Sequence, residues 1–467
     1  MEEKKIALFE TRPVPKAVIA LSIPTIISSL VMVLYNLADT YFVGMLNDPI
    51  QNAAVTLVAP VILAFNAINN LFGVGASSIM SRALGKKDFD TVRKSSAFGF
   101  YCALAGGVLM SVLCTVFQNP LLALLGTDPS TFLATRDYMI WTVNFGAVPA
   151  ILNVVLAYMV RSEGASVHAS IGTMSGCLLN IILDPVFIMP WGLNMGAAGA
   201  GLATFLSNCV ACLYFFILLC VKRRSTYVCI RPSGFKLSKT IAVGVCAVGI
   251  PAAIQNLLNV TGMTVLNNFT SAYGSDAVAA MGIVQKINMV PLYIALGASQ
   301  GVMPLVSYNY SSGNTKRMKQ VITFTMKILM TFMLAITAGY YLGAGFLTKM
   351  FMENAAIINY GTHFLRGLCL ALPFLCIDFL AVGVFQACGF GKKAFVFAVF
   401  RKIVLEIPAL FLLNWLFPLY GLAYAQLVAE IILAVAATIV LIKFFRQGNQ
   451  PAEGELVSAS RIGQKHP

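Results

Sequence analysis

Residues 17–45 read AVIALSIPTIISSLVMVLYNLADTYFVGM, an apolar run in which Asp39 is the only charged residue. A helix rises about 1.5 Å per residue, so this run is long enough to cross a hydrocarbon core of about 30 Å. No small-residue cleavage site interrupts it. The run therefore predicts a retained first transmembrane helix rather than a removed signal peptide.

Similar runs recur along the whole chain. Hydrophobic residues make up 58% of the 467 positions and charged residues only 11%, whereas soluble domains carry roughly 25% charged residues. Such a chain cannot cover a water-facing surface, so we expect an all-α polytopic membrane protein. The predicted transmembrane helices, twelve in number, are 17–45, 52–81, 95–117, 134–160, 168–190, 196–221, 240–269, 277–307, 319–347, 357–388, 394–415 and 421–445.

The basic residues divide the connecting segments into two alternating sets. One set, which includes 82–94, Arg161, 222–239 and the segment from Lys443 onward, holds most of the 32 basic residues, and the other set holds only Lys349. Positively charged loops stay in the cytoplasm. We therefore expect both termini to be cytoplasmic. The net charge of +14 then reflects membrane topology and not nucleic-acid binding.

The chain also repeats itself. Ser22-Ile-Pro24 matches Gly249-Ile-Pro251, and Gly201-Leu-Ala-Thr204 matches Gly421-Leu-Ala-Tyr424. Because each half holds an even number of helices, the halves share one orientation and form two parallel-related six-helix lobes. The expected organisation is a cytoplasmic N-terminus 1–16, an N-lobe 17–221, a basic cytoplasmic linker 222–239, a C-lobe 240–446 and a disordered cytoplasmic tail 447–467.

Charged residues inside the spans are informative, because each costs about 2.5 kcal/mol or more at the centre of a transmembrane helix. Asp39 and Asp184 lie roughly 12 and 9 Å below the outer ends of their helices, and Thr204 lies roughly 12 Å down the sixth helix. Asn36 and Asn180 share a helix face with the two acids. We predict that these five residues form a coupling site for a cation or a proton.

Two carboxylates in a low dielectric do not both stay ionised cheaply, so this pair would share a proton or bind a sodium ion. The sodium ligands would be Asp39, Asn180, Asp184 and Thr204. The alternative interpretation is a pair of structural acids at helix breaks, since Pro185 follows Asp184 directly.

The second half carries three further acids within its spans. Glu406 follows Arg401 and Lys402 by about one helical turn, which favours a structural ion pair. Asp378 is interpreted either as a substrate-cavity residue or as a packing acid. Whether Asp378, Glu406 and Glu430 contribute to coupling is left open.

Gln255, Asn256 and Asn259 in the span 240–269 are expected to line a polar substrate cavity. A membrane-embedded enzyme would need a nucleophile with its base, or a metal site, and the sequence suggests neither. The CxxC at Cys209 and Cys212 has no second pair and no histidine beside it. We therefore expect no catalytic residue and no cofactor.

The family signature is carried by Pro24, by the run Tyr35-Asn-Leu-Ala-Asp39-Thr-Tyr-Phe-Val-Gly44 and by Ser81-Arg-Ala-Leu-Gly85. These segments closely resemble the multidrug and toxic compound extrusion (MATE) family, and the stretch from Gly301-Val-Met-Pro304 to Tyr310 resembles its second-half counterpart. The resemblance covers residues 14 to 446. It is closest to the bacterial branch whose coupling site lies in the N-lobe.

The resemblance implies an antiporter in the bacterial inner (plasma) membrane, which exports organic cations while protons or sodium ions enter. A monomer with no cofactor beyond the coupling ion is implied as well. In relatives, the acid of the first helix is protonated and the helix bends near its proline, which correspond here to Asp39 and Pro24. The family's N-lobe cation site corresponds to the same set as above: Asp39, Asn180, Asp184 and Thr204.

The family's polar N-lobe network also includes a tyrosine and an asparagine, which Tyr138 and Asn153 match. Relatives with a C-lobe cation site carry a glutamate where this chain has Gln255, which puts C-lobe coupling in doubt although Asp378 matches the family acid. The alternative within the superfamily is a flippase of lipid-linked oligosaccharide. The phosphates of such a substrate would need a basic cavity to bind them. The charged residues within the predicted spans are predominantly acidic.

Overall fold

The computed structural model describes residues 2–446, with side chains from Ile6 onward. The described residues form helices and no strand. The expected disordered tail, 447–467, lies outside them.

The first half of the chain begins with a short helix, α1 (Glu2–Glu10), which is followed by a long one, α2 (Val14–Met45). Its remaining elements are α3 (Pro49–Ile68), η1 (Asn69–Val74), α4 (Gly75–Gly85), α5 (Phe89–Val116), α6 (Gln118–Leu124), α7 (Phe132–Met139), η2 (Ile140–Phe145), α8 (Ala147–Ser162), α9 (Ser166–Ile188) and α10 (Ala197–Val221).

After η3 (Pro232–Gly234) the second half begins with α11 (Lys239–Ser271) and α12 (Ser275–Ser311). It continues with α13 (Thr315–Lys349), α14 (Ala355–Cys369), α15 (Leu372–Ala387), α16 (Gly391–Val399), η4 (Phe400–Glu406), α17 (Ile407–Leu416) and α18 (Leu422–Arg446).

The described residues contain nine helices that are long and apolar enough to cross a membrane, where α3, η1 and α4 count as one. Two further spans are bent: α7 and η2 meet α8 at 47°, and α14 meets α15 at 46°. The run α16–η4–α17 completes the expected twelve. Both bent spans are the fourth of their half, as an internal repeat predicts.

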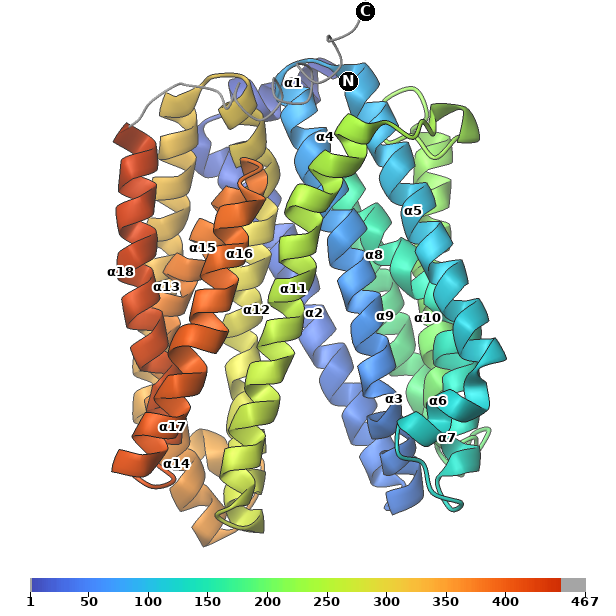
Figure 1. Cartoon of the computed structure of the whole chain (residues 1–467), viewed down its shortest axis with the longest axis vertical. Helices are drawn as coiled ribbons and strands as arrows, with labels where there is room; N and C mark the ends of the chain where they lie inside the picture. The colour runs from blue at the N-terminus through green and yellow to red at the C-terminus, as the bar shows by residue number, and fades with distance from the viewer. Residues whose placement is uncertain (1, 447–467) are drawn as a thin grey trace, which may run out of the picture.

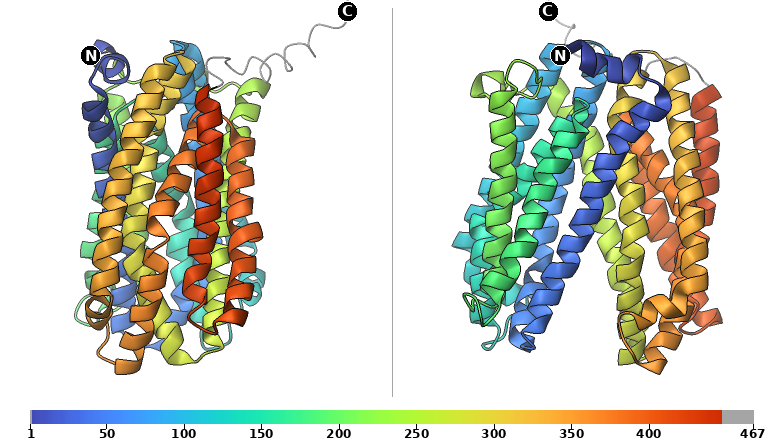
Figure 2. Two further views of the ribbon diagram at one scale, coloured as in Figure 1. Left: turned by 90° about the vertical axis from the view of Figure 1, so that its left-hand side faces the viewer. Right: turned by 180° about the vertical axis from the view of Figure 1, so that it is seen from behind.

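The helices form two groups, α2–α10 (the N-lobe) and α11–α18 (the C-lobe), which stand side by side (Figure 1 and Figure 2). Between the lobes, α2 packs along α12, and α11 packs on η1 and α4. The lobes meet at the end where α1 lies and diverge toward the other end (Figure 1). We call these the closed end, marked by α1 and the linker 222–239, and the open end, marked by Met45 and Ser275.

Glycine allows the lobes to approach at the closed end. A Cβ atom on Gly249 of α11 would lie 2.0 Å from the carbonyl oxygen of Leu71, and one on Gly75 would lie 2.4 Å from that of Val245. A backbone carbonyl cannot move aside as a flexible side chain does. Any larger residue at these two positions would therefore force the lobes apart.

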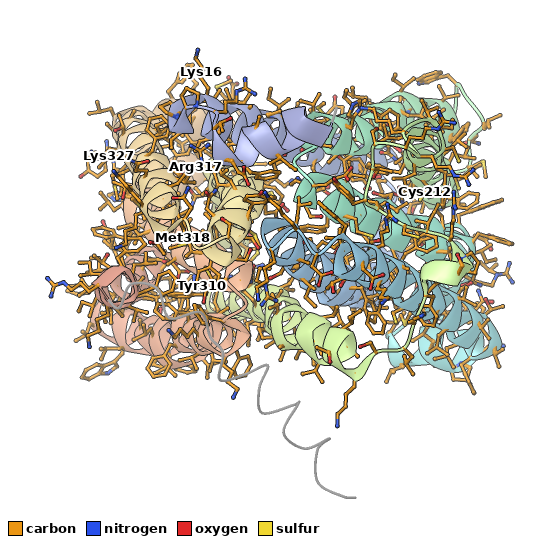
Figure 3. The ribbon with its side chains drawn as sticks, turned by 90° about the horizontal axis from the view of Figure 1, so that it is seen from above. Lys16, Cys212, Tyr310, Arg317, Met318 and Lys327 are labelled. Carbon is orange, nitrogen blue, oxygen red and sulfur yellow. The ribbon has the colours of Figure 1, made fainter. Side chains whose placement is uncertain are left out.

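α1 contacts both lobes at the closed end. The ring of Phe9 stacks on Tyr308 of α12, with 4.8 Å between the ring centroids, and the Tyr308 hydroxyl donates to Glu10 at 2.6 Å. Arg317, which lies beside α1 in Figure 3, donates from Nε to the carbonyl oxygen of Phe9 at 2.6 Å. The same phenylalanine contacts Gly164 of the N-lobe. The sequence predicted this segment only as a charged cytoplasmic terminus.

Candidate functional site

Two carboxylates lie inside the N-lobe, Asp39 on α2 and Asp184 on α9, and these two helices pack against each other. They are close enough to interact electrostatically. Asp184 is fully buried, and its Oδ1 atom has no hydrogen-bond partner among the described residues. Asp39 is half-buried. A buried carboxylate with an unpaired oxygen is costly to keep charged, so this pair is suited to take up a proton or a cation.

Asn180, one turn before Asp184, connects the acid to α10. With its amide oriented to satisfy both neighbours, it donates from Nδ2 to Asp184 Oδ2 at 2.9 Å. Its oxygen accepts from the backbone N–H of Thr204 at 3.1 Å and from Thr204 Oγ1 at 3.3 Å. The structure thus brings together Asp39, Asn180, Asp184 and Thr204, whose oxygen atoms are the ligand type that hard cations prefer.

Asn36 makes its side-chain hydrogen bond within its own helix and not to either acid. Its Nδ2 donates to the carbonyl oxygen of Met32, one turn back on its own helix, at 2.9 Å. The side chain lies instead at the wall of the cavity described next.

A cavity of about 540 Å³ lies between the lobes. Asn180 and Thr204 form part of its wall, so Asp184, which accepts a hydrogen bond from Asn180, lies directly behind it. The other predicted residues that line it are Tyr138, Asn153, Gln255, Asn256 and Asn259. Sequence reasoning missed further polar lining residues, which include Asn66, Asn69, Asn70, Tyr158, Asn208, Tyr293, Gln300 and Gln386.

Hydrogen bonds between side chains fix several of these amides. Asn153 donates to Asn208 Oδ1 at 2.7 Å, and Gln386 donates to Gln255 Oε1 at 3.2 Å. Asn69, at the start of the π-helix η1, is buried, and its Oδ1 has no partner among the described residues. The wall therefore offers neutral donors and acceptors together with aromatic rings, a surface suited to ligands of varied shape.

Asp378 is not among the described residues that line this cavity, which favours the second of its two interpretations, a packing acid. It is buried within the C-lobe, and its Oδ2 lies 3.5 Å from Arg401 Nη1. Arg401 also donates from Nε to Glu430 Oε1 at 2.7 Å. The π-helix η4, which lies within the predicted span 394–415, places Arg401 inside the lobe. Lys402 binds Glu406 at 2.6 Å, the ion pair that the spacing predicts.

Arg161 is a residue that sequence reasoning misplaced. It was counted with the loops, but it lies in the last turn of α8 with only 6% of its side chain exposed. It is the single charged residue among the described residues that line the cavity, and it lies at the closed end. Gly164 was the signal in the sequence that Arg161 belongs to a helix end. It has a φ of 85° in the short turn between α8 and α9, which leaves no room for a loop.

The family model described as "MatE" matches residues 24–186 and 251–412. The multidrug export protein MepA of Staphylococcus saprophyticus is 35% identical over 445 residues, covering 94% of this chain and 96% of the relative. MepA of Staphylococcus aureus strain MRSA252 is 34% identical with the same coverage. A solved outward-facing structure of a multidrug resistance MATE family transporter is 27% identical, with a TM-score of 0.89, and covers 95% of this chain and 99% of that chain.

Proposed function

The chain belongs to the multidrug and toxic compound extrusion family of membrane transporters, and we propose that it exports organic cations from the cytoplasm in exchange for protons or sodium ions. It is a transporter and not an enzyme. The observation that carries the proposal is the carboxylate pair of half-buried Asp39 and fully buried Asp184 beside a cavity between two lobes. The staphylococcal relatives are named multidrug export proteins, which supports a broad substrate range for this chain.

Coupling requires that the ion binds the two conformations with different affinity. In the structure, Asp184 has one oxygen unpaired and Asn180 fixes the other. Closing the cavity removes water from the carboxylates, which strengthens their attraction for a proton or a sodium ion. If the ion favours the conformation that releases substrate to the outside, its inward gradient drives export.

Helix α2 is suited to transmit this event. It carries Asp39 and packs along both α9 and α12, so it contacts both lobes. Pro24 lies within α2 and lacks the N–H that an uninterrupted helix would use. We propose that ion binding at Asp39 changes the bend of α2 near Pro24 and thereby changes the contact between the lobes.

The cavity is suited to organic cations because aromatic faces and neutral amides attract a delocalised positive charge without fixing one geometry. A flippase for lipid-linked oligosaccharide would have to bind phosphates, each with its own negative charge. The cavity wall contains one charged residue among those described, which is too few to neutralise such a group. The cavity therefore suits the export of organic cations better than the transfer of a lipid-linked oligosaccharide.

The basic segments 82–94 and 222–239 lie at the closed end, and positively charged loops stay inside. We therefore place the closed end in the cytoplasm of a bacterial cell and the open end outside. No contact with a second copy is needed to complete the cavity or the carboxylate pair, and we propose that a monomer transports.

Proteoliposomes test this proposal. Purified protein should move ethidium against its gradient when a proton or a sodium gradient is imposed separately across the vesicle membrane. One of the two gradients should suffice. If neither gradient drives ethidium movement by protein that binds the dye, ion-coupled export is wrong.

A further inference from the structure

Arg161 lies at the closed end of the cavity and has no anionic partner. Burying an unpaired guanidinium costs several kcal/mol. Yet its Nε atom makes no hydrogen bond to a described residue, and no carboxylate of the described residues interacts with it. Its nearest polar contact is Gln300 Oε1 of the C-lobe, 3.5 Å from Nη1 and at the outer limit of a hydrogen bond. The ring of Tyr158 lies 5.6 Å from the guanidinium carbon.

The surrounding polar groups already have other partners. Glu163, the acid nearest in sequence, accepts from Thr226 Oγ1 at 3.0 Å and from the backbone N–H of Tyr227 at 2.9 Å. It is therefore directed toward the linker and away from the cavity. The neighbouring Ser78 and Ser81 hydroxyls donate to the carbonyl oxygens of Gln386 and Ser162. Structural interactions within the described chain therefore leave the Arg161 guanidinium available to a ligand.

We propose that Arg161 is a specificity-determining residue of the cavity, which binds the carboxylate of those substrates that carry one. A guanidinium presents paired N–H donors whose geometry matches the two oxygens of a carboxylate. The inference rests on the proposed function and assigns one residue of the cavity to the recognition of one substrate group. The cationic or aromatic part of the ligand would lie farther toward the open end, among the tyrosines and amides of the wall.

A single carboxylate is a better match than a phosphate. The cavity wall supplies one positive charge, which balances one carboxylate and leaves a phosphate with an unpaired charge.

Two dyes that differ only at a carboxylate test the proposal. Rhodamine B carries a free carboxylate and a delocalised cation, and its ethyl ester carries the same cation without the carboxylate. Their dissociation constants are measured by fluorescence anisotropy on the purified full chain. Arg161→Gln should weaken rhodamine B binding about tenfold relative to the ester, the size expected for one charge-assisted hydrogen-bonded pair. Arg161→Lys, which keeps the charge but loses the paired geometry, should give an intermediate ratio.

Arg223→Gln is the matched control, because it removes one positive charge from the exposed linker. The ratio of the two dissociation constants should not change in this variant. In the unmodified protein, benzoate should displace rhodamine B more effectively than it displaces the ester, compared with an equal concentration of chloride. This second measurement applies even if the Arg161 variants do not fold.

An unchanged ratio in Arg161→Gln, or equal displacement of both dyes by benzoate, would overturn the carboxylate subsite alone. The ester still reports on the cavity in that case. If the unmodified protein bound neither dye, the proposed transport of organic cations would fail, and the subsite that rests on it would fail too.

Discussion

At the scale of single residues, Asp39 and Asp184 should act as one titrating unit. Asp39→Asn or Asp184→Asn should abolish gradient-driven ethidium efflux, because each variant removes a charge that the ion needs. The double variant should lose little more than either single one, since the members of one functional unit are not additive. Efflux is measured in vesicles at equal protein level.

Asp90→Asn is the control for this series, because that acid is exposed at the closed end. Near-normal export by one of the two single variants would remove that acid from the mechanism. Near-normal export by both would remove the coupling site from the N-lobe.

Arg401 should be a structural residue of the C-lobe. Arg401→Gln leaves Asp378 and Glu430 buried without their cation, which costs about 3–5 kcal/mol when one partner of a buried pair is removed. The melting temperature of the purified protein should fall clearly, and adding Glu430→Gln should restore part of the loss. Asp378→Asn should impair efflux less than Asp39→Asn does. Stronger impairment by Asp378→Asn would move coupling to the C-lobe.

At the scale of elements, the contact of α11 with η1 depends on Gly249. Gly249→Ala should lower both the melting temperature and the efflux rate, because the new Cβ would overlap the Leu71 carbonyl oxygen at 2.0 Å. Gly343→Ala on α13 is the matched control. No atom lies within 4 Å of its Cβ position, and alanine is the better helix former by about 1 kcal/mol. Equal behaviour of the two variants would show that the close approach is unimportant.

The helices illustrate what the sequence predicted and what it did not. Apolar runs gave twelve spans, because lipid imposes a strong compositional signal over about 20 residues. The π-helices η1, η2 and η4 carry no such signal, since one extra residue in a turn leaves composition unchanged. For that reason the sequence did not predict that η4 places Arg401 beside Asp378 and Glu430.

The candidate site shows the same division. Helix rise alone gave similar predicted depths in the membrane for Asp39, Asp184 and Thr204. The sequence could therefore predict that these three residues lie at one level. The hydrogen bond that the Asn36 side chain makes is a local one, to the carbonyl oxygen of Met32. The position of the Arg161 side chain depends on a contact with the other lobe. Side-chain partners of these two kinds are set by packing, which one sequence does not specify.

At the scale of the whole molecule, the orientation that we propose rests on the basic residues at the closed end. A cysteine introduced as Ser233→Cys in the exposed linker should be protected from a membrane-impermeant maleimide in intact cells. Ser275→Cys at the open end, also exposed, should react. The unmodified chain, with its exposed Cys220, supplies the background labelling. Reaction at Ser233→Cys without cell lysis would reverse the orientation.

The exchange of an organic cation for an ion is the central claim, and ion flux driven by substrate tests it most directly. Vesicles containing the protein, with equal pH and equal sodium on both sides, receive ethidium on one side only. We expect protons or sodium ions to move opposite to the dye, because antiport links the two fluxes. Asp39→Asn should abolish the ion movement. Dye entry without movement of either ion, or ion movement that persists in Asp39→Asn, would contradict the account.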